Sequence, residues 1–139
     1  MLHTQRSYGG SCVAPHHLAA SAGRDVLKQG GNAVEAMVAA AAAIAVVYPH
    51  MNALGGDGFW LIHEPGKAPV AIDACGPAAQ LANRDFYSGE SQIPERGPKA
   101  TLTMAGTISG WQEALNVAAG WGSALPLPTL LADAIRHAD

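Results

Sequence analysis

The side chains best suited to take part in chemistry lie in "VAIDACGP", residues 70–77, which carries a carboxylate and a thiol close together. Asp73 falls at the end of a predicted strand, where it could hold the backbone amides of the next loop or bind a substrate; we favour the structural role. Cys75 follows, and a thiol here could line a cleft, although a free cysteine is more often a small buried apolar residue. Both residues are candidates for substrate binding.

A second carboxylate stands among three glycines in "LGGDGF", residues 54–59, between two apolar segments. The spacing is not G-x-G-x-x-G, and the stretch leads from helix to strand, the reverse of a phosphate-binding turn. We interpret it as a structural loop in which Gly55, Gly56 and Gly58 let the backbone pass tightly between buried elements, with little room for a Cβ. Asp57 is expected to bond loop amides; the alternative is a loop that forms part of a substrate wall.

The histidines do not form a recognisable metal site. His16 and His17 are adjacent, so their side chains would point about 100° apart on a helix. We interpret His16 as a group at the start of a helix. No Ser-His-Asp or Cys-His arrangement can be argued from spacing, so we expect neither a metal site nor a catalytic residue from these patterns.

Apolar periodicity predicts the elements that position these residues. Leu18, Ala22 and Val26 lie four positions apart, which is typical of one face of a helix. The residues of "EPGK", 64–67, follow the usual order of a turn between two strands. In chain order the pattern predicts a short strand at 11–15, helices at 16–29 and 32–48, strands at 58–63 and 68–73, and helices at 107–119 and from Pro128.

The second predicted helix differs from the others in being apolar on every side. Asn32 can cap its free amides, and Glu35, three residues on, completes a capping-box pair. The apolar run from 36 to 48 is well short of the ~20 residues needed to span a bilayer. We therefore expect a fully buried helix at the centre of the core.

Composition excludes several classes of partner. The 139 residues carry a net charge of −3 with 14% charged residues, and they contain no run of Lys or Arg. Nucleic acid and anionic membrane surfaces do not fit this charge, and the low charged fraction indicates surface covered by another segment. Cys12 and Cys75 cannot build a disulfide framework. Residues 1–10 show no signal peptide, so we expect a cytoplasmic protein.

Four motifs in order, "GGNAVEA", "VVYPH", "LGGDGF" and "AID", make a specific combination. Together with "NRDFY" and "AGTISGW", they make the chain from about residue 10 onward closely resemble the N-terminal part of the large subunit of gamma-glutamyltranspeptidases. The resemblance implies an N-terminal-nucleophile hydrolase fold, an α/β architecture of the αββα type with two β-sheets between helix layers. Residues 1–139 would be an incomplete, helix-rich N-terminal portion of that domain.

The resemblance implies an enzyme made as a precursor that cuts itself into a large and a small subunit. The nucleophile is the threonine exposed at the start of the small subunit, and its own α-amino group is the base. A gamma-glutamyl group moves to that threonine and then to water or an amino acid, while backbone amides stabilise the oxyanion. No metal or organic cofactor is implied. The implied partners are the rest of the large subunit, the small subunit and a gamma-glutamyl or glutaryl amide; a homo-oligomer is left open.

The same resemblance places the processing point beyond this chain. Thr101, Thr103 and Thr107 match large-subunit positions and not the nucleophile. We therefore expect residues 1–139 to contain no catalytic residue and to be inert alone, in keeping with a last helix that has no cap. Family members are often exported, which leaves a periplasmic or secreted location open beside the cytoplasmic one.

One departure from the family concerns specificity. In the well-studied branch of the family the strand continues as I-D-F-R-E, and that arginine binds the substrate α-carboxylate; aligned at Asp73, this chain has Cys75 in its place. A thiol cannot replace the bidentate fork of a guanidinium. Arg84 matches a different family position, and Arg96 is the nearest candidate to compensate. The spellings "APHHLAA" and "GGDGFWLI" are closer to the branch near glutaryl-cephalosporin acylases, and a glutaryl-type acylase or an inactive scaffold homologue are the alternatives.

Overall fold

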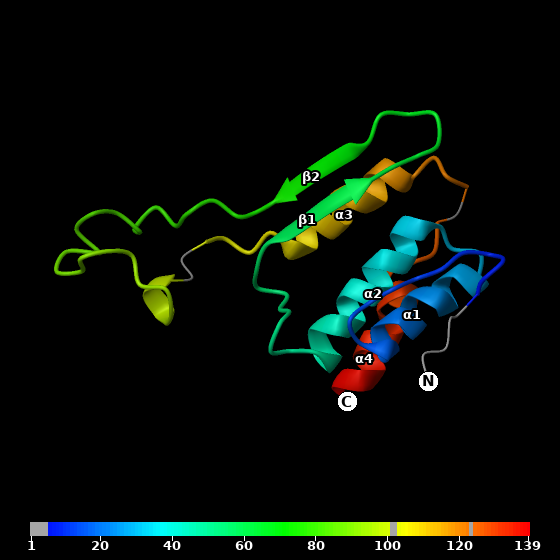
Figure 1. The fold of residues 1–139 in the computed structure, drawn as a ribbon, viewed down its shortest axis with the longest axis horizontal. Helices are drawn as coiled ribbons and strands as arrows, with labels where there is room; N and C mark the ends of the chain where they lie inside the picture. Colours follow the sequence, from blue (N-terminus) through cyan, green and yellow to red (C-terminus); the bar gives the residue numbers. More distant parts are fainter. Residues whose placement is uncertain (1–5, 101–102, 123) are drawn as a thin grey trace. The chain divides into compact units, whose positions relative to one another are not determined.

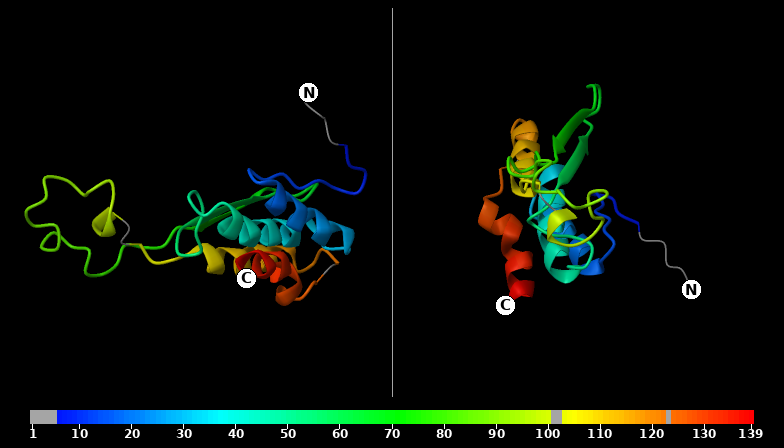
Figure 2. Two further views of the ribbon diagram at one scale, coloured as in Figure 1. Left: turned by 90° about the horizontal axis from the view of Figure 1, so that it is seen from below. Right: turned by 90° about the vertical axis from the view of Figure 1, so that its left-hand side faces the viewer.

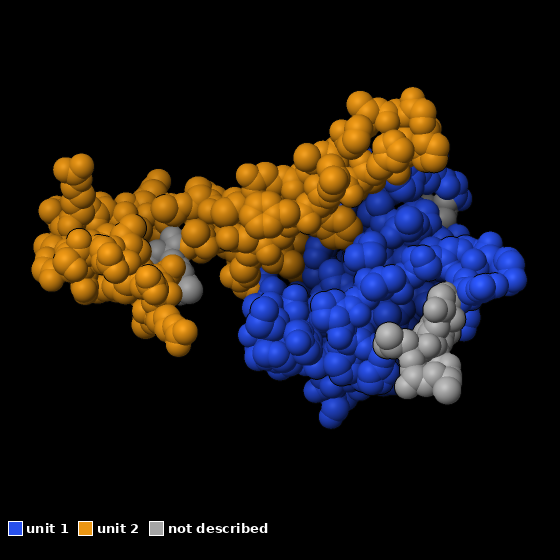
Figure 3. Space-filling model, in the orientation of Figure 1, with its two compact units in different colours: residues 1–54, 111–139 blue, residues 55–110 orange. Residues whose placement is uncertain are grey.

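The structure, a computed structural model, describes residues 6–100, 103–122 and 124–139. The chain divides into two compact units, which Figure 3 colours separately: residues 1–54 with 111–139, and residues 55–110. The first unit is helical, and the second contains a two-stranded sheet (Figure 1). Each unit is described by itself below.

Helix α1, His17–Lys28, begins and ends where local signals predict. The Nδ1 atom of His16 accepts a hydrogen bond from the Leu18 amide at 3.3 Å, so His16 is the N-cap, as expected. At the other end Gly30 has a φ of 87°, and the Gly31 amide donates to the Val26 carbonyl at 3.0 Å. Glycine takes this left-handed conformation without a Cβ penalty, which explains why the helix stops there.

Helix α2, Ala33–Val47, carries the predicted capping box. The Asn32 side chain accepts from the amides of Val34 and Glu35, both at 3.0 Å, and a carboxylate oxygen of Glu35 accepts from the Asn32 amide at 2.8 Å. The other oxygen of Glu35 accepts from the Leu125 amide at 2.7 Å. A single buried carboxylate therefore caps the helix and holds the segment that leads into the last helix, α4, Leu127–Ala138.

The core of the first unit forms where α2 packs against α1 and against α4 (Figures 1 and 2). Most of the buried side chains are alanine or valine, and small side chains let helix backbones approach closely. The largest fully buried side chains are those of Val38 and Leu130. Helix α3, Thr107–Ala118, begins in the second unit and continues into the first from Trp111 onward. Its part in the first unit buries Trp111, Ala114 and Ala118.

Two predictions about the first unit are wrong. The predicted strand at 11–15 is irregular chain, because the described part of this unit contains no strand to pair with it. Helix α2 is central but not fully buried: Met37 is 43% exposed and residues 44–48 are half-buried. The reason is that α1 and α4 cover α2 from two directions and leave a stripe of its surface without a neighbour in this unit.

The second unit is built on an antiparallel hairpin of β1, Gly58–Ile62, and β2, Val70–Ala74. Its turn matches the prediction, since the Lys67 amide donates to the Glu64 carbonyl at 3.0 Å. The pairing places Gly58 opposite Ala74. The end of β2 therefore lies beside the start of β1, and this brings the two candidate stretches of the sequence together.

A long loop leaves β2 and returns to α3, and its described residues, 75–100 and 103–106, are irregular apart from a 3₁₀ turn at Pro98–Ala100 and an isolated antiparallel bridge between Ala78 and Thr103 (Figure 1). Its far part is held by its own side chains. The Tyr87 hydroxyl donates to the Lys99 carbonyl at 2.9 Å, and the Lys99 ammonium pairs with Glu90 at 2.9 Å and lies 5.5 Å from the centre of the Phe86 ring.

Candidate functional site

The candidate site is the place in the second unit where β2 ends and β1 begins. Asp73 is the penultimate residue of β2, Cys75 follows the strand, and Asp57 directly precedes β1. Because Gly58 pairs with Ala74, the next residue outward on each strand, Asp57 and Cys75, lie across from one another. The hairpin register thus gathers the two carboxylates and the thiol that the sequence analysis singled out.

Both carboxylates hold backbone amides of the turn that follows β2. A carboxylate oxygen of Asp73 accepts from the Cys75 amide at 2.9 Å, which is the structural role favoured for it. A carboxylate oxygen of Asp57 accepts from the Gly76 amide at 3.2 Å. Asp57 was expected to bond amides of its own loop; the partner instead lies across the hairpin. Substrate binding by Asp73 stays a prediction.

The Cys75 thiol is exposed, unlike the small buried residue that a free cysteine usually is. Its pKa is raised, chiefly by a hydrogen bond to the Asp57 carboxylate, with further contributions from burial and from the charges of Asp57 and Asp73. A nearby negative charge disfavours the thiolate, which explains the direction. The raised pKa therefore favours the protonated thiol, which is the less nucleophilic form.

The expected reason for the glycines of the 55–58 loop is wrong. A Cβ on Gly55 or Gly56 would meet no described atom within 4 Å, and one on Gly58 would make an ordinary 3.6 Å contact with the Thr107 Cα. None of the three has a positive φ. The loop is held through its backbone instead: the Gly56 carbonyl accepts from the Thr107 amide at 3.0 Å and from its hydroxyl at 2.7 Å.

The glycines that the packing does require are Gly76 and Gly106, which the sequence analysis missed. A Cβ on Gly76 would overlap the Met104 carbonyl oxygen, and one on Gly106 would overlap that of Ala74. The Met104 amide also donates to the Pro77 carbonyl at 3.0 Å, so the two ends of the long loop run side by side. The available signal was an isolated glycine in each extended stretch, which often marks a close approach of backbones.

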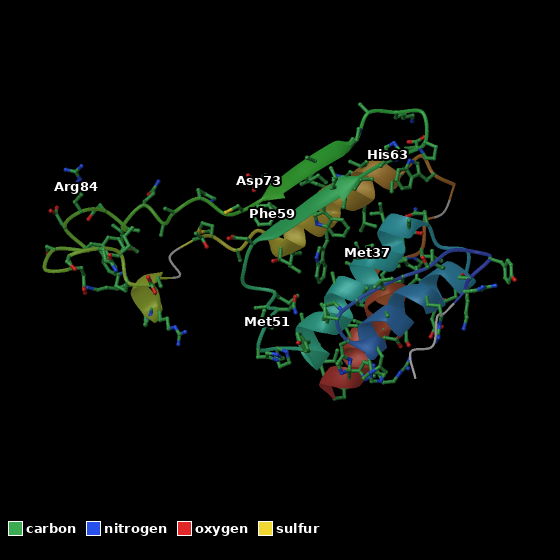
Figure 4. The ribbon with its side chains drawn as sticks, viewed as in Figure 1. Met37, Met51, Phe59, His63, Asp73 and Arg84 are labelled. Carbon is green, nitrogen blue, oxygen red and sulfur yellow. The ribbon has the colours of Figure 1, made fainter. Side chains whose placement is uncertain are left out.

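Arg96, the candidate compensator, and Arg84, which matches a different family position, both lie on the long loop. Both are exposed, and neither has an ion-pair partner among the described residues. Figure 4 shows Arg84 on the far part of that loop, well away from Asp73. Thr103 and Thr107 are described, whereas Thr101 lies outside the described residues. Thr107 is only 8% exposed, and its hydroxyl donates to the Gly56 carbonyl of the 55–58 loop.

Away from the predicted residues, the described ranges contain a cavity but no cluster of metal ligands and no helix able to span a membrane. A cavity of about 240 Å³ in the first unit lies between α1 and α4, lined by Asp25, Val26, Gln29, Thr129, Leu130 and Arg136 among others. Among the described residues, no group of three or more His, Cys, Asp or Glu side chains is placed to hold a metal ion. No helix in the described ranges is long and apolar enough to cross a bilayer.

Comparison with known protein families decides the relationship. Residues 19–139 match the family model of gamma-glutamyltranspeptidase. The chain belongs to the gamma-glutamyltranspeptidase family. This confirms the family to which the motifs from "GGNAVEA" to "AID" pointed.

The chain is similar to an amidohydrolase proenzyme, a transpeptidase and an acylase. The chain is 60% identical over 131 residues to the oxamate amidohydrolase proenzyme of Klebsiella pneumoniae, a match that covers 94% of this chain and 25% of that protein. It resembles the crystal structure of Helicobacter pylori gamma-glutamyltranspeptidase with a TM-score of 0.82 at 29% identity, over 96% of this chain and 38% of that chain. It also resembles the cephalosporin acylase from Bacillus halodurans with a TM-score of 0.73 at 33% identity, over 86% of this chain and 22% of that chain.

These neighbours confirm the predicted fold class. The described helices and hairpin are a mixed α/β portion of the N-terminal-nucleophile hydrolase fold of this family. The relatives are named as an amidohydrolase, a transpeptidase and an acylase, so hydrolases and transferases surround this chain. The chain spans about a quarter of the Klebsiella protein, so the activity of a whole protein of this kind is a matter for proposal.

Proposed function

We propose that this chain is the N-terminal portion of a self-processing amide hydrolase whose nucleophilic threonine lies outside residues 1–139. The observation that carries the proposal is the 60% identity, over 94% of the chain, to an oxamate amidohydrolase proenzyme. The partners of this portion are the remaining segments of the same precursor, and the portion alone is inactive. No catalytic residue is assigned within it.

We propose oxamate, or a similarly small amide, as the substrate. In a gamma-glutamyl donor three carbon atoms separate the α-carboxylate from the scissile carbonyl. The well-studied branch of the family binds this carboxylate with the arginine that Cys75 replaces here. In oxamate the carboxylate is bonded directly to the scissile carbonyl, so a distant cation is not needed. The absence of a guanidinium at position 75 thus removes a contact that only the longer donor uses.

The test uses the full-length precursor. We expect it to cut itself into two chains, visible by denaturing electrophoresis, and to release ammonia from oxamate. We expect kcat/KM for oxamate to exceed that for gamma-glutamyl 4-nitroanilide by about tenfold or more, because the α-carboxylate of the latter lacks its bidentate partner. A precursor that stays uncut and releases no ammonia contradicts the proposal and supports a scaffold protein.

A glutaryl-type acylase is the second candidate, favoured by the likeness to the Bacillus halodurans acylase. A glutaryl donor has a terminal carboxylate but no α-amino group. Faster release from glutaryl 4-nitroanilide than from oxamate would select this candidate. Faster release from gamma-glutamyl 4-nitroanilide than from both would show that another residue replaces the arginine.

A further inference from the structure

We propose that Asp57 is the positioning residue for position 75, and that residues 57 and 75 together set which charge an acyl donor meets there. The inference rests on the proposed function, because it takes position 75 to face the acyl group. Asp57 acts through residue 75 and is not assigned a contact with substrate.

The strand register puts Asp57 across from Cys75. Two carboxylates from the two strands then hold consecutive amides of one turn: Asp73 takes the Cys75 amide at 2.9 Å, and Asp57 takes the Gly76 amide at 3.2 Å. Amides held by ionised acceptors form the stronger class of hydrogen bond, so the backbone at position 75 is fixed from both sides.

The turn cannot relax away from Asp57. The Gly76 Cα faces the Met104 carbonyl so closely that a Cβ would overlap it, and the Met104 amide donates to the Pro77 carbonyl at 3.0 Å. The backbone at position 75 is consequently kept beside the Asp57 carboxylate. The raised pKa of the Cys75 thiol, caused first by its hydrogen bond to Asp57, agrees with this contact.

Asp57 and Asp73 place two carboxylates beside a neutral thiol, and the loop cations Arg84 and Arg96 pair with neither in the described ranges. An arginine at position 75 would therefore find Asp57 as its ion-pair partner, and its guanidinium would not be free to bind the carboxylate of a donor. Specificity for an acyl group whose carboxylate is distant from the scissile carbonyl, as in a glutaryl donor, thus needs a change at both positions.

The first experiment measures the thiol directly in the full-length protein. Alkylation of Cys75 by iodoacetamide is followed between pH 7 and 10 by peptide mass mapping, in wild type, Asp57→Asn and the control Asp85→Asn. Asparagine keeps an oxygen for the Gly76 amide and removes the charge, so we expect half-maximal alkylation at a lower pH in Asp57→Asn. Asp85 is exposed on the long loop, and its variant should follow wild type. An unchanged profile in Asp57→Asn would overturn the proposal, whether or not the enzyme is active.

The second experiment measures donor charge. The ratio of kcat/KM for glutaryl 4-nitroanilide to that for the neutral pentanoyl 4-nitroanilide is compared in wild type, Asp57→Asn, Cys75→Arg and the double variant. We expect about a tenfold rise in the double variant and less than about threefold in either single one. An equal rise in Cys75→Arg alone overturns the proposal, and so does a double variant no different from the singles. If wild type cleaves no amide at all, the proposed function fails, and the alkylation profile decides the role of Asp57 by itself.

Discussion

The environment of Cys75 shows how a single position can be tied to residues on both strands of a hairpin. Its amide donates to Asp73 and the next amide donates to Asp57, while its thiol donates to the Gly76 carbonyl at 3.9 Å and has a pKa raised chiefly by Asp57. A carboxylate next to a thiol raises the thiol pKa and suppresses its reactivity. At this position the backbone amides are held by carboxylates, and the same carboxylates favour the neutral form of the thiol.

At the residue scale we predict opposite outcomes for two glycines of the same unit. Gly76→Ala should lower the free energy of unfolding by about 2 kcal/mol or more, because its Cβ overlaps the Met104 carbonyl oxygen and the backbone must move. Gly55→Ala should change it by less than about 0.5 kcal/mol, since its Cβ points into open space and its φ is not positive.

Urea unfolding of the full-length protein, followed by circular dichroism, measures both variants under the same conditions. Equal midpoints for Gly76→Ala and wild type would show that the two ends of the long loop are further apart than the structure has them.

In the first unit one carboxylate, that of Glu35, connects the start of α2 to the segment ahead of α4. Glu35 is 3% exposed, and its two oxygens accept from the Asn32 amide at the start of α2 and from the Leu125 amide ahead of α4. Removing a buried acceptor leaves its donors unsatisfied, which costs more than the bond itself contributes. The same side chain thereby stabilises a helix end and a contact between elements far apart in sequence.

At the scale of the elements we predict that Glu35→Ala lowers the free energy of unfolding by about 2–4 kcal/mol, because two part-buried amides lose their buried carboxylate partner. Glu35→Gln should cost clearly less, since an amide oxygen can still serve one donor. The matched control is Glu113→Ala on α3, where the side chain is exposed and the expected change is within about 0.5 kcal/mol.

Thermal and urea unfolding of the three full-length variants test the order of these effects. Similar stabilities for Glu35→Ala and Glu113→Ala would mean that water satisfies the two amides and that Glu35 does not join the elements.

The molecule as a whole presents large apolar side chains to solvent. On one face of the hairpin Phe59 is 71% exposed and Leu61 is 78% exposed, while the long loop exposes Leu81 at 79% and Ile93 at 63%. Exposed apolar side chains that gather on one element usually mark a surface covered by another chain or segment. This agrees with the low charged fraction of the sequence, 14%.

At the scale of the whole molecule we predict that residues 1–139, produced alone, self-associate through these exposed side chains. Light scattering coupled to size-exclusion chromatography should give a mass above the 14.2 kDa of one chain. The variant Phe59→Lys with Leu61→Lys should shift the distribution toward the monomer, because charges on this face oppose close approach. A monomeric wild-type chain with a cooperative melting transition would contradict the prediction.

Local sequence determined the elements of this protein wherever the signal and the structure it specifies are neighbours in the chain. The capping box of Asn32 and Glu35, the stop at Gly30 and the 64–67 turn all act within a few residues, so they can be read without knowing the fold. The strand predicted at 11–15 failed because a strand depends on a partner, and a partner is a property of the fold.

Only the tertiary structure decided which residues distant in the sequence are joined, both in the candidate site and in the first unit. The Asp57 to Gly76 bond joins residues 19 apart and the Glu35 to Leu125 bond joins residues 90 apart, separations at which local patterns carry no information. For the same reason the sequence pointed to the glycines of the 55–58 loop, where the density of glycine is high, whereas close packing required Gly76 and Gly106. Contacts between distant backbones are set by how elements pack, and that packing follows from the summed burial of the whole chain rather than from any one motif.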